Sequence, residues 1–126
     1  MVRAWGTYPW FGEHRAEKIH PDDRESFKRV ANNVKVFEFF QGNGNYNIFR
    51  YANQAYRIND TLSKILPEPS YWYGENVIIK NKGELKGKVC DVMWHFNEKQ
   101  FYYFLSIDGK KTSKRYFEDE LETVNA

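Results

Sequence analysis

The sequence lacks several features that would place it in a particular class. It has a single cysteine, Cys90, so an internal disulfide is excluded. Its apolar runs are far too short to span a bilayer, and residues 1–10 hold no apolar run of the kind that a signal peptide needs. The formal net charge is only +2, so no strong basic field marks a nucleic-acid binder. We therefore expect a cytoplasmic protein without a membrane segment.

Aromatic side chains are what the sequence has in excess. They make up 18% of the 126 residues, whereas the hydrophobic share of 41% and the charged share of 29% are ordinary for a folded protein. Small β-rich domains need large side chains to fill a thin core. Ten Phe, nine Tyr and four Trp exceed what such a core hides, so several are expected at a surface.

The first part of the chain, residues 1–66, predicts an N-terminal arm, a short helix and a small β-meander. The opening segment is aromatic without a regular period, which indicates an extended arm packed on the body. Pro21 and the acidic residues after it are typical of a helix start, and Phe27, Val30 and Ala31 form a narrow apolar stripe. Strands are expected at 34–41, 46–51 and 55–59, followed by a helical turn at 60–66.

Two prolines, Pro67 and Pro69, predict a stiff linker over residues 67–72. The second part, residues 73–126, then follows a clearer strand pattern. Strands are expected at 76–80, 87–96, 101–107, 112–116 and 121–124, with a 3₁₀-like turn at 117–120. The Asp108-Gly109 pair predicts a tight hairpin turn.

This order of strands, with a long loop after the first and a helical turn before the last, resembles an SH3-like barrel of the Tudor or KOW type. The resemblance covers residues 73–124. It implies a five-stranded barrel within a mainly β fold, and it implies no particular activity. We expect this barrel to pack against the N-terminal helix and meander as one unit.

A weak internal repeat accompanies this resemblance. The segments that begin at Lys35-Val36 and Lys88-Val89 share the order strand, turn, strand, tight turn, strand, helical turn. Two degenerate small barrels in tandem would produce this order, and so would any two β-meanders. The opening pattern WGTYPWF…IHPDD…KVF also resembles small uncharacterised bacterial proteins, which implies a bacterial or phage source.

The candidates for catalysis or metal binding are few. Cys90 and His95 are the one close Cys/His pair, but five residues apart on a strand they point to opposite faces unless a bulge intervenes. We expect Cys90 on a core face with Val92, Trp94 and Phe96, and His95 opposite with Asp91 and Met93.

The cluster of His14, His20, Asp22 and Asp23 matches no common metal-ligand spacing, and the acids 118–120 read as a solvated turn. We therefore expect no catalytic residue, metal or cofactor.

Aromatic residues in the second part suggest a binding surface instead. On the third predicted strand Phe101, Tyr103 and Leu105 share one face, and Tyr102 and Phe104 share the other. One small barrel has a single core, so the second face either packs on the N-terminal part or remains exposed to a partner. The candidate partner-binding residues are Trp72, Trp94, His95, Tyr102, Phe104 and Tyr116.

Basic residues lie next to these aromatics, at Lys110, Lys111, Lys114 and Arg115. Cations interleaved with aromatics suit single-stranded nucleic acid, although the acids that follow at 118–122 oppose phosphate.

The leading hypothesis is a non-enzymatic protein- or peptide-binding protein, such as an immunity or inhibitor protein against a toxin or defence enzyme. The alternatives are a single-stranded nucleic-acid-binding module and an aromatic pocket for a small molecule or a modified side chain.

Overall fold

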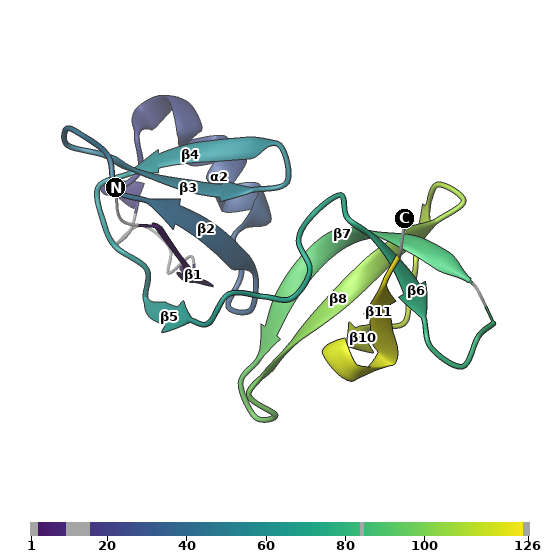
Figure 1. Ribbon diagram of the computed structural model, residues 1–126. Helices are drawn as coiled ribbons and strands as arrows, with labels where there is room; N and C mark the ends of the chain where they lie inside the picture. Colours follow the sequence, from purple (N-terminus) through teal and green to yellow (C-terminus); the bar gives the residue numbers. More distant parts are fainter. Residues whose placement is uncertain (1–2, 10–15, 84, 125–126) are drawn as a thin grey trace. The chain divides into compact units, whose positions relative to one another are not determined.

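The computed structural model describes residues 3–9, 16–83 and 85–124. The chain divides into two compact units, Met1–Glu68 (unit 1) and Pro69–Ala126 (unit 2), so the boundary falls inside the segment 67–72. Each unit is built on its own antiparallel sheet (Figure 1). Strands hold 47% and helices 12% of the structure, so the prediction of a mainly β protein is confirmed. Among the described residues, no helix has the length and apolar character needed to cross a membrane.

Unit 1 contains a five-stranded sheet, sheet A, with the strand order β4-β3-β2-β1-β5. Its strands are β1 (Arg3–Thr7), β2 (Val36–Phe40), β3 (Asn47–Tyr51), β4 (Gln54–Ile58) and β5 (Lys64–Leu66). The helical segment between β1 and β2 begins with the 3₁₀ turn η1 (Pro21–Asp23) and continues as α2 (Arg24–Val30), as the proline and acidic residues predicted.

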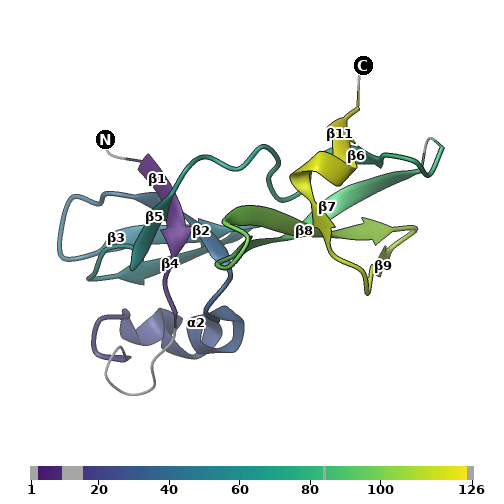
Figure 2. The same cartoon turned by 90° about the horizontal axis from the view of Figure 1, so that it is seen from below.

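The core of unit 1 lies between this helical segment and one face of sheet A. Figure 2 shows α2 on that face. Phe27 is the buried residue of α2, and its ring lies 5.4 Å from that of Phe37 and 5.2 Å from that of Tyr56. The apolar spacing seen in the sequence therefore places one aromatic side chain into a largely aromatic core.

Two expectations for unit 1 need correction, because both segments are strands of sheet A. The N-terminal arm is β1, which lies between β2 and β5. The predicted helical turn at 60–66 is wrong, since Lys64–Leu66 forms β5 and pairs with β1 in the register Trp5↔Leu66. The residues that favour a helical turn lie within the segment itself, whereas its pairing partner β1 is separated from it in sequence by almost the whole unit. Gly6 permits the close approach, because a Cβ there would overlap the carbonyl oxygen of Lys64.

Unit 2 contains the second sheet, sheet B, with the order β10-β8-β7-β6-β11 and β9 paired to β8. Its strands are β6 (Asn76–Ile79), β7 (Lys86–His95), β8 (Gln100–Ile107), β9 (Lys110–Lys111), β10 (Tyr116–Phe117) and β11 (Leu121–Thr123). The predicted 3₁₀ turn is present as η2 (Glu118–Glu120), immediately before the last strand.

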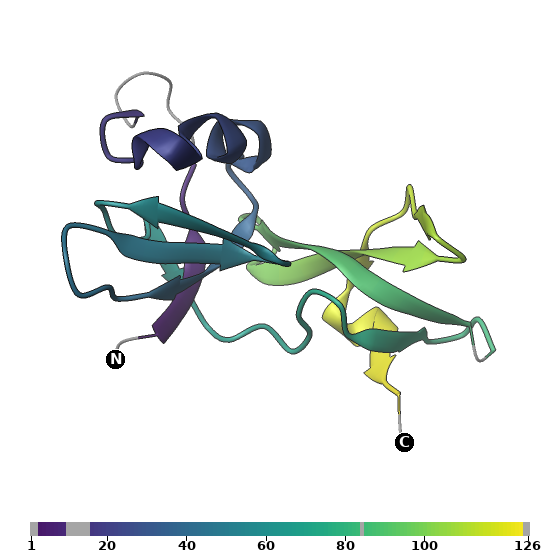
Figure 3. The same ribbon diagram turned by 90° about the horizontal axis from the view of Figure 1, so that it is seen from above.

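One face of sheet B carries the core of unit 2. Tyr103 and Leu105 of β8 are fully buried and pair with Val92 and Val89 of β7. Tyr71, from the predicted linker, is also buried, and its ring lies 5.5 Å from that of Tyr103. Figure 3 shows the long β7–β8 hairpin with the η2 turn on one side of it.

The fourth predicted strand, 112–116, is wrong as a continuous element. β9 pairs with one end of β8 and β10 with the other. Between them, Thr112 Oγ1 accepts a hydrogen bond from the Leu105 backbone N–H, and the Thr112 N–H donates to the Leu105 carbonyl. These two bonds attach the chain to β8 at Thr112 alone, and one of them uses the Thr112 side chain. No continuous strand therefore forms between β9 and β10.

The expectation for Cys90 is also corrected. The register between β7 and β8 shifts between Val89 and Asp91, so Cys90 is the extra residue of a β-bulge and is half-buried. Val92 and Trp94 lie on the core face as predicted, but Phe96 is in the following turn and 45% exposed. The alternation of residues along the sequence cannot reveal a bulge, because the extra residue exchanges the faces of all residues beyond it.

Both units follow the same strand path. In each, the first four strands run in order across the sheet and the last strand returns beside the first: β5 beside β1, and β11 beside β6. Unit 1 carries its helix in the first connection, and unit 2 carries its 3₁₀ turn in the last.

Candidate binding site

The face of sheet B opposite its core, called the outer face below, gathers most of the candidate residues. Cross-strand pairs define it, because directly opposed residues point to the same side of a sheet. Asp91 pairs with Phe104, Met93 with Tyr102, and His95 with Gln100. From the strands beside β8, Phe117 pairs with Tyr102, and Lys111 pairs with Ser106. The predicted division of β8 and of His95 with Asp91 and Met93 is confirmed.

An aromatic cluster occupies one end of the outer face. The Tyr102 ring lies 6.0 Å from Phe117, 6.1 Å from Phe104 and 6.1 Å from His95, all at steep interplanar angles. Tyr102 is 9% exposed, whereas Phe104, Phe117 and His95 are half-buried. These half-buried rings offer edges and partial faces to a ligand.

Two cations lie over the rings. The guanidinium carbon of Arg115 is 5.1 Å from the Tyr102 centroid and 5.6 Å from that of Phe117. Lys111 Nζ is 4.8 Å from the Phe104 centroid. Each lies within the range of a cation–π interaction. The sequence predicts that Tyr102 and Phe104 are covered either by the N-terminal part or by an outside partner. A cover formed by cations of unit 2 itself is not part of that prediction.

A buried carboxylate anchors the centre of the outer face. Asp91 is 6% exposed, and its carboxylate accepts a hydrogen bond from the Tyr73 hydroxyl at 2.9 Å and pairs with Lys111 Nζ at 3.3 Å. A buried carboxylate needs such partners, because desolvation otherwise disfavours its charge. Asp91 thus holds Lys111 above Phe104. Arg115 has no acidic partner among the described residues.

The acidic residues after β10 are largely engaged away from the outer face. Glu118 Oε2 accepts hydrogen bonds from the Tyr103 hydroxyl on the core side, at 2.8 Å, and from the Ser70 N–H. Burial, together with the negative charge of Glu118, raises the pKa of Tyr103, so this phenol stays protonated. Glu120 accepts from the Phe117 N–H and pairs with Lys114 Nζ at 3.3 Å. The repulsion that the sequence predicted between these acids and a phosphate is therefore reduced at the outer face.

The remaining predicted residues lie elsewhere. Trp94 and Tyr116 pair with Phe101 and Tyr103, which places both on the core side, and both are 7% exposed. The Trp94 indole N–H is buried and has no hydrogen-bond partner in the described part of the chain. Trp72 is half-buried, with its ring 5.0 Å from that of Tyr73. Lys110 pairs with Ile107 of β8, which places it on the side of the sheet opposite to Lys111, and Lys114 lies over the Tyr116 ring at 4.9 Å.

Several members of the outer face were not anticipated as site residues, among them Phe117, Met93 and Tyr73. Alternation from the buried Tyr116 would have placed Phe117 on the opposite face, had the short strand Tyr116–Phe117 been recognised. No local signal marks Tyr73, because its hydrogen bond to Asp91 joins residues 18 positions apart.

The groups considered for catalysis and metal binding have other partners. Cys90 Sγ donates to the Phe104 carbonyl at 3.4 Å, and His95 Nδ1 accepts from the Glu98 N–H at 3.0 Å. Near the helix, Arg57 donates to Asp23 at 2.9 Å, and this guanidinium lowers the pKa of the carboxyl. His20 Nδ1 accepts from the Asp22 N–H. His14 lies outside the described residues.

Comparison with known families gives one match, which covers residues 1–122 and is described as a family of unknown function (DUF6960). Comparison with curated proteins and with solved structures gives no match.

Proposed function

The chain belongs to the DUF6960 family, whose function is unknown, and on this premise we propose that it is a non-catalytic binding protein whose outer face binds single-stranded nucleic acid. The observation that carries this proposal is the layered arrangement of half-buried rings and cations on one sheet face, with the neighbouring glutamates engaged elsewhere. Protein modules that bind single strands combine aromatic stacking with cations along the backbone.

Each part of the cluster has a role in this proposal. Unpaired bases stack on the guanidinium plane of Arg115, which lies over Tyr102 and Phe117, or on the exposed part of the half-buried Phe104 ring, and phosphates pair with Arg115. A duplex hides the faces of its bases, so the rings favour single strands over double strands.

Composition favours nucleic acid over a protein partner at this face. The cores of protein interfaces are enriched in aromatics, Met and Arg but depleted in Lys, Asp and Ser. The rings, Met93 and Arg115 of the outer face suit either partner, whereas Lys88, Lys111 and Ser106 favour nucleic acid. A cage for methylated side chains has less support, because Arg115 and Lys111 already lie on the rings that would form it.

Binding of a fluorescent oligothymidylate, measured by anisotropy across a salt series, tests the proposal. We expect affinity to fall steeply as salt rises, with a slope of roughly 0.7 per phosphate contact. Arg115→Gln should lower that slope by about 0.7, because one contact is lost. Phe104→Ala should weaken binding by about 1–3 kcal/mol if one base stacks there.

The control is Lys64→Gln, which removes the same charge from an exposed position of unit 1. It should leave both slope and affinity close to wild type. Absence of oligonucleotide binding at low salt, or an equal loss in the control, would overturn the proposal.

A protein partner is the second candidate, and the observation that favours it lies in unit 1. β5 is the terminal strand of sheet A, and its Ile65 side chain is 72% exposed. An apolar residue on an edge strand suits strand addition by a partner chain. An immunity or inhibitor protein would use such an edge to block a toxin or defence enzyme.

Cross-linking with a purified candidate toxin encoded beside the gene tests this second candidate. The cross-link should form with wild type and with Lys18→Gln, and it should be lost with Ile65→Lys. A cross-link that persists in Ile65→Lys would exclude this edge.

We also infer that both units are SH3-like barrels in tandem. The shared position of the last strand beside the first supports this, because this strand order is the one expected for a five-stranded SH3-like barrel. An experimental structure in which β5 or β11 pairs elsewhere would overturn it.

A further inference from the structure

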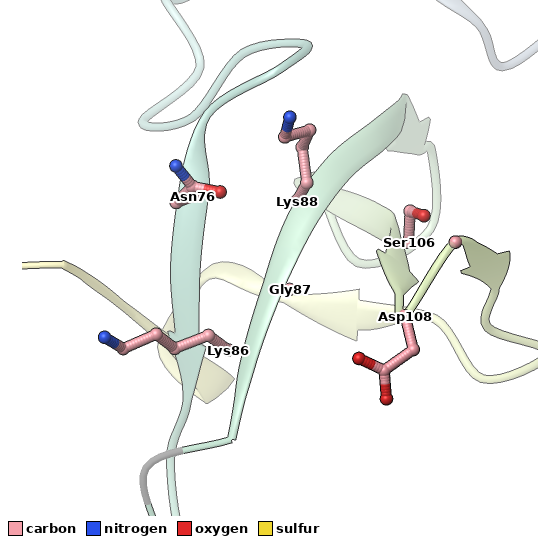
Figure 4. A pocket seen from close by; sticks show the side chains of 7 residues that line it. Asn76, Lys86, Gly87, Lys88, Ser106 and Asp108 are labelled. Atoms are coloured by element: carbon pink, nitrogen blue, oxygen red, sulfur yellow. The ribbon is translucent and has the colours of Figure 1, made fainter.

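A hollow of about 350 Å³ lies at the end of the outer face away from the aromatic cluster (Figure 4). Its volume is that of about ten water molecules, which is enough for a phosphate group with part of an attached sugar. The lining residues come from β6, β7, β8 and the β8–β9 turn; they are Asn76, Lys86, Gly87, Lys88, Ser106, Asp108 and Gly109. No motif or pattern in the sequence marks any of them as a binding residue.

The strand register places a row of hydrogen-bond donors along this hollow. Asn76 pairs with Lys88 across β6 and β7, Lys88 with Ser106 across β7 and β8, and Ser106 with Lys111 across β8 and β9. Directly opposed residues have their Cβ atoms about 5 Å apart on the same side of the sheet. An amide, an ammonium, a hydroxyl and a second ammonium therefore follow one another across four strands, and no carboxylate interrupts them.

The cations of the hollow are available to a ligand. Lys86 and Lys88 are exposed, and neither ammonium pairs with an acid in the part of the chain that the structure describes. Asp91, the nearest buried carboxylate along β7, is already bound by Lys111 and Tyr73. The side chains of Asn76, Lys86, Lys88 and Ser106 supply four donor groups with an excess of positive charge. This set matches an oxyanion, which accepts several charge-assisted hydrogen bonds at once.

Two acids lie at the border of the hollow. Asp108 is in the β8–β9 turn, and Figure 4 shows its carboxylate pointing away from Lys88 and Ser106. Glu122 of β11 is in the neighbouring row, where Ile78 separates it from Lys86. Among the described lining residues, Asp108 is thus the one with a negative charge, like a phosphate. Its substitution provides a test in which phosphate affinity should rise, whereas substitution of the lysines should lower it.

We propose that this hollow is a phosphate subsite, in which Lys88, Asn76 and Ser106 hold a phosphate group of the bound strand and Lys86 adds charge at the rim. The nucleic-acid source of the phosphate rests on the proposed function, whereas the phosphate chemistry of the hollow does not. Lys111 joins the two regions, since it ends the donor row and lies over Phe104. A strand that stacks a base at Phe104 therefore reaches the hollow with its backbone.

Titration of the full chain with inorganic phosphate, followed by amide NMR shifts, tests the subsite without nucleic acid. The largest shifts are expected at Lys88 and Ser106. Lys86→Gln with Lys88→Gln should weaken phosphate binding by between about twofold and thirtyfold, the range for two exposed ion pairs. Lys18→Gln with Lys64→Gln should leave the affinity unchanged.

Asp108→Asn should strengthen phosphate binding by about twofold to fivefold, because it removes a like charge from the rim. Asp108 has a φ of +52°, and Asn adopts that conformation readily, so the variant keeps the turn. A merely structural role for these residues would not produce opposite effects from Lys88→Gln and Asp108→Asn. Phosphate shifts elsewhere, or equal affinities for all variants, would overturn the subsite.

Three further ligands identify the source of the phosphate: oligothymidylate, a free nucleotide and a phosphoserine peptide. We expect oligothymidylate to bind most tightly and to lose affinity in the Lys86→Gln, Lys88→Gln variant. Oligonucleotide binding that ignores these lysines would overturn the subsite and leave the proposed function standing. Binding of phosphate or of the phosphopeptide through Lys88, without oligonucleotide binding, would overturn the nucleic-acid source and the proposed function together.

Discussion

Each unit has a buried carboxylate on its second strand. Glu38 lies on β2, and Asp91 lies on β7 directly after the bulge at Cys90. They are 2% and 6% exposed. Arg3 and Arg50 bind Glu38, and Lys111 binds Asp91. Each unit thus has a buried acid on its second strand, and cations on the same sheet neutralise its charge.

The ion pair between Asp23 and Arg57 gives a prediction at the same scale. Hydrogen bonds from the Arg57 side chain hold the pKa of Asp23 below its ordinary value of 3.8. Its contribution to stability is therefore complete above that value and is lost as pH falls through the lower folded-state pKa. Asp23→Asn should destabilise the protein by about 1 kcal/mol at neutral pH. This difference should disappear in acid.

Denaturant unfolding at a series of pH values measures this effect. Asp22→Asn is the matched control, because the Asp22 side chain is 78% exposed and lies 3.9 Å from Arg57. It should cost little at any pH. A constant difference between wild type and Asp23→Asn down to pH 2 would contradict the linkage.

At the scale of the element, the pairing of β1 with β5 depends on one glycine. A Cβ at Gly6 would overlap the Lys64 carbonyl oxygen and would lie 2.9 Å from Leu62 Cδ1. The backbone of β5 cannot yield without losing its pairing to β1. Gly6 therefore determines whether the last strand of unit 1 can return beside the first.

Gly6→Ala is expected to destabilise the protein by at least about 1–3 kcal/mol, the usual cost of overpacking. Amide exchange should accelerate first in β5. Gly44→Ala serves as the control, since a Cβ at Gly44 meets no atom within 4 Å. Thermal unfolding measures both variants, and equal midpoints would show that β5 tolerates the side chain.

At the scale of the whole molecule, both units are small. Unit 1 ends at Glu68, so each unit has fewer than 70 residues. Chains of that size bury a modest fraction of their surface and are marginally stable alone. Because each unit is marginally stable alone, we expect the two units to unfold together as one cooperative unit.

That prediction concerns cooperativity, and thermal unfolding followed by NMR tests it. Gly6→Ala perturbs unit 1 alone, yet it should lower the midpoint recorded by amides of unit 2 by the same amount. If unit 2 kept its wild-type midpoint, the two units would unfold independently.

The sequence by itself determined the elements whose signals are local. The proline and acids before Phe27 marked the helix, the Asp108-Gly109 pair marked a hairpin turn, and alternation assigned Tyr102 and Phe104 to the face opposite the core. These signals depend on neighbours within a few residues, so they can be read without a fold.

The tertiary structure decided whatever depends on residues far apart in the chain. It made Lys64–Leu66 a strand, because β1 pairs with it, and it interrupted the fourth strand of unit 2 through the two bonds of Thr112 with Leu105. It also assembled the candidate site, since the row Asn76, Lys88, Ser106 and Lys111 comes from four strands whose register sets it. Spacing along the chain carries no record of that register, which is why the sequence pointed to the aromatic face but not to the hollow beside it.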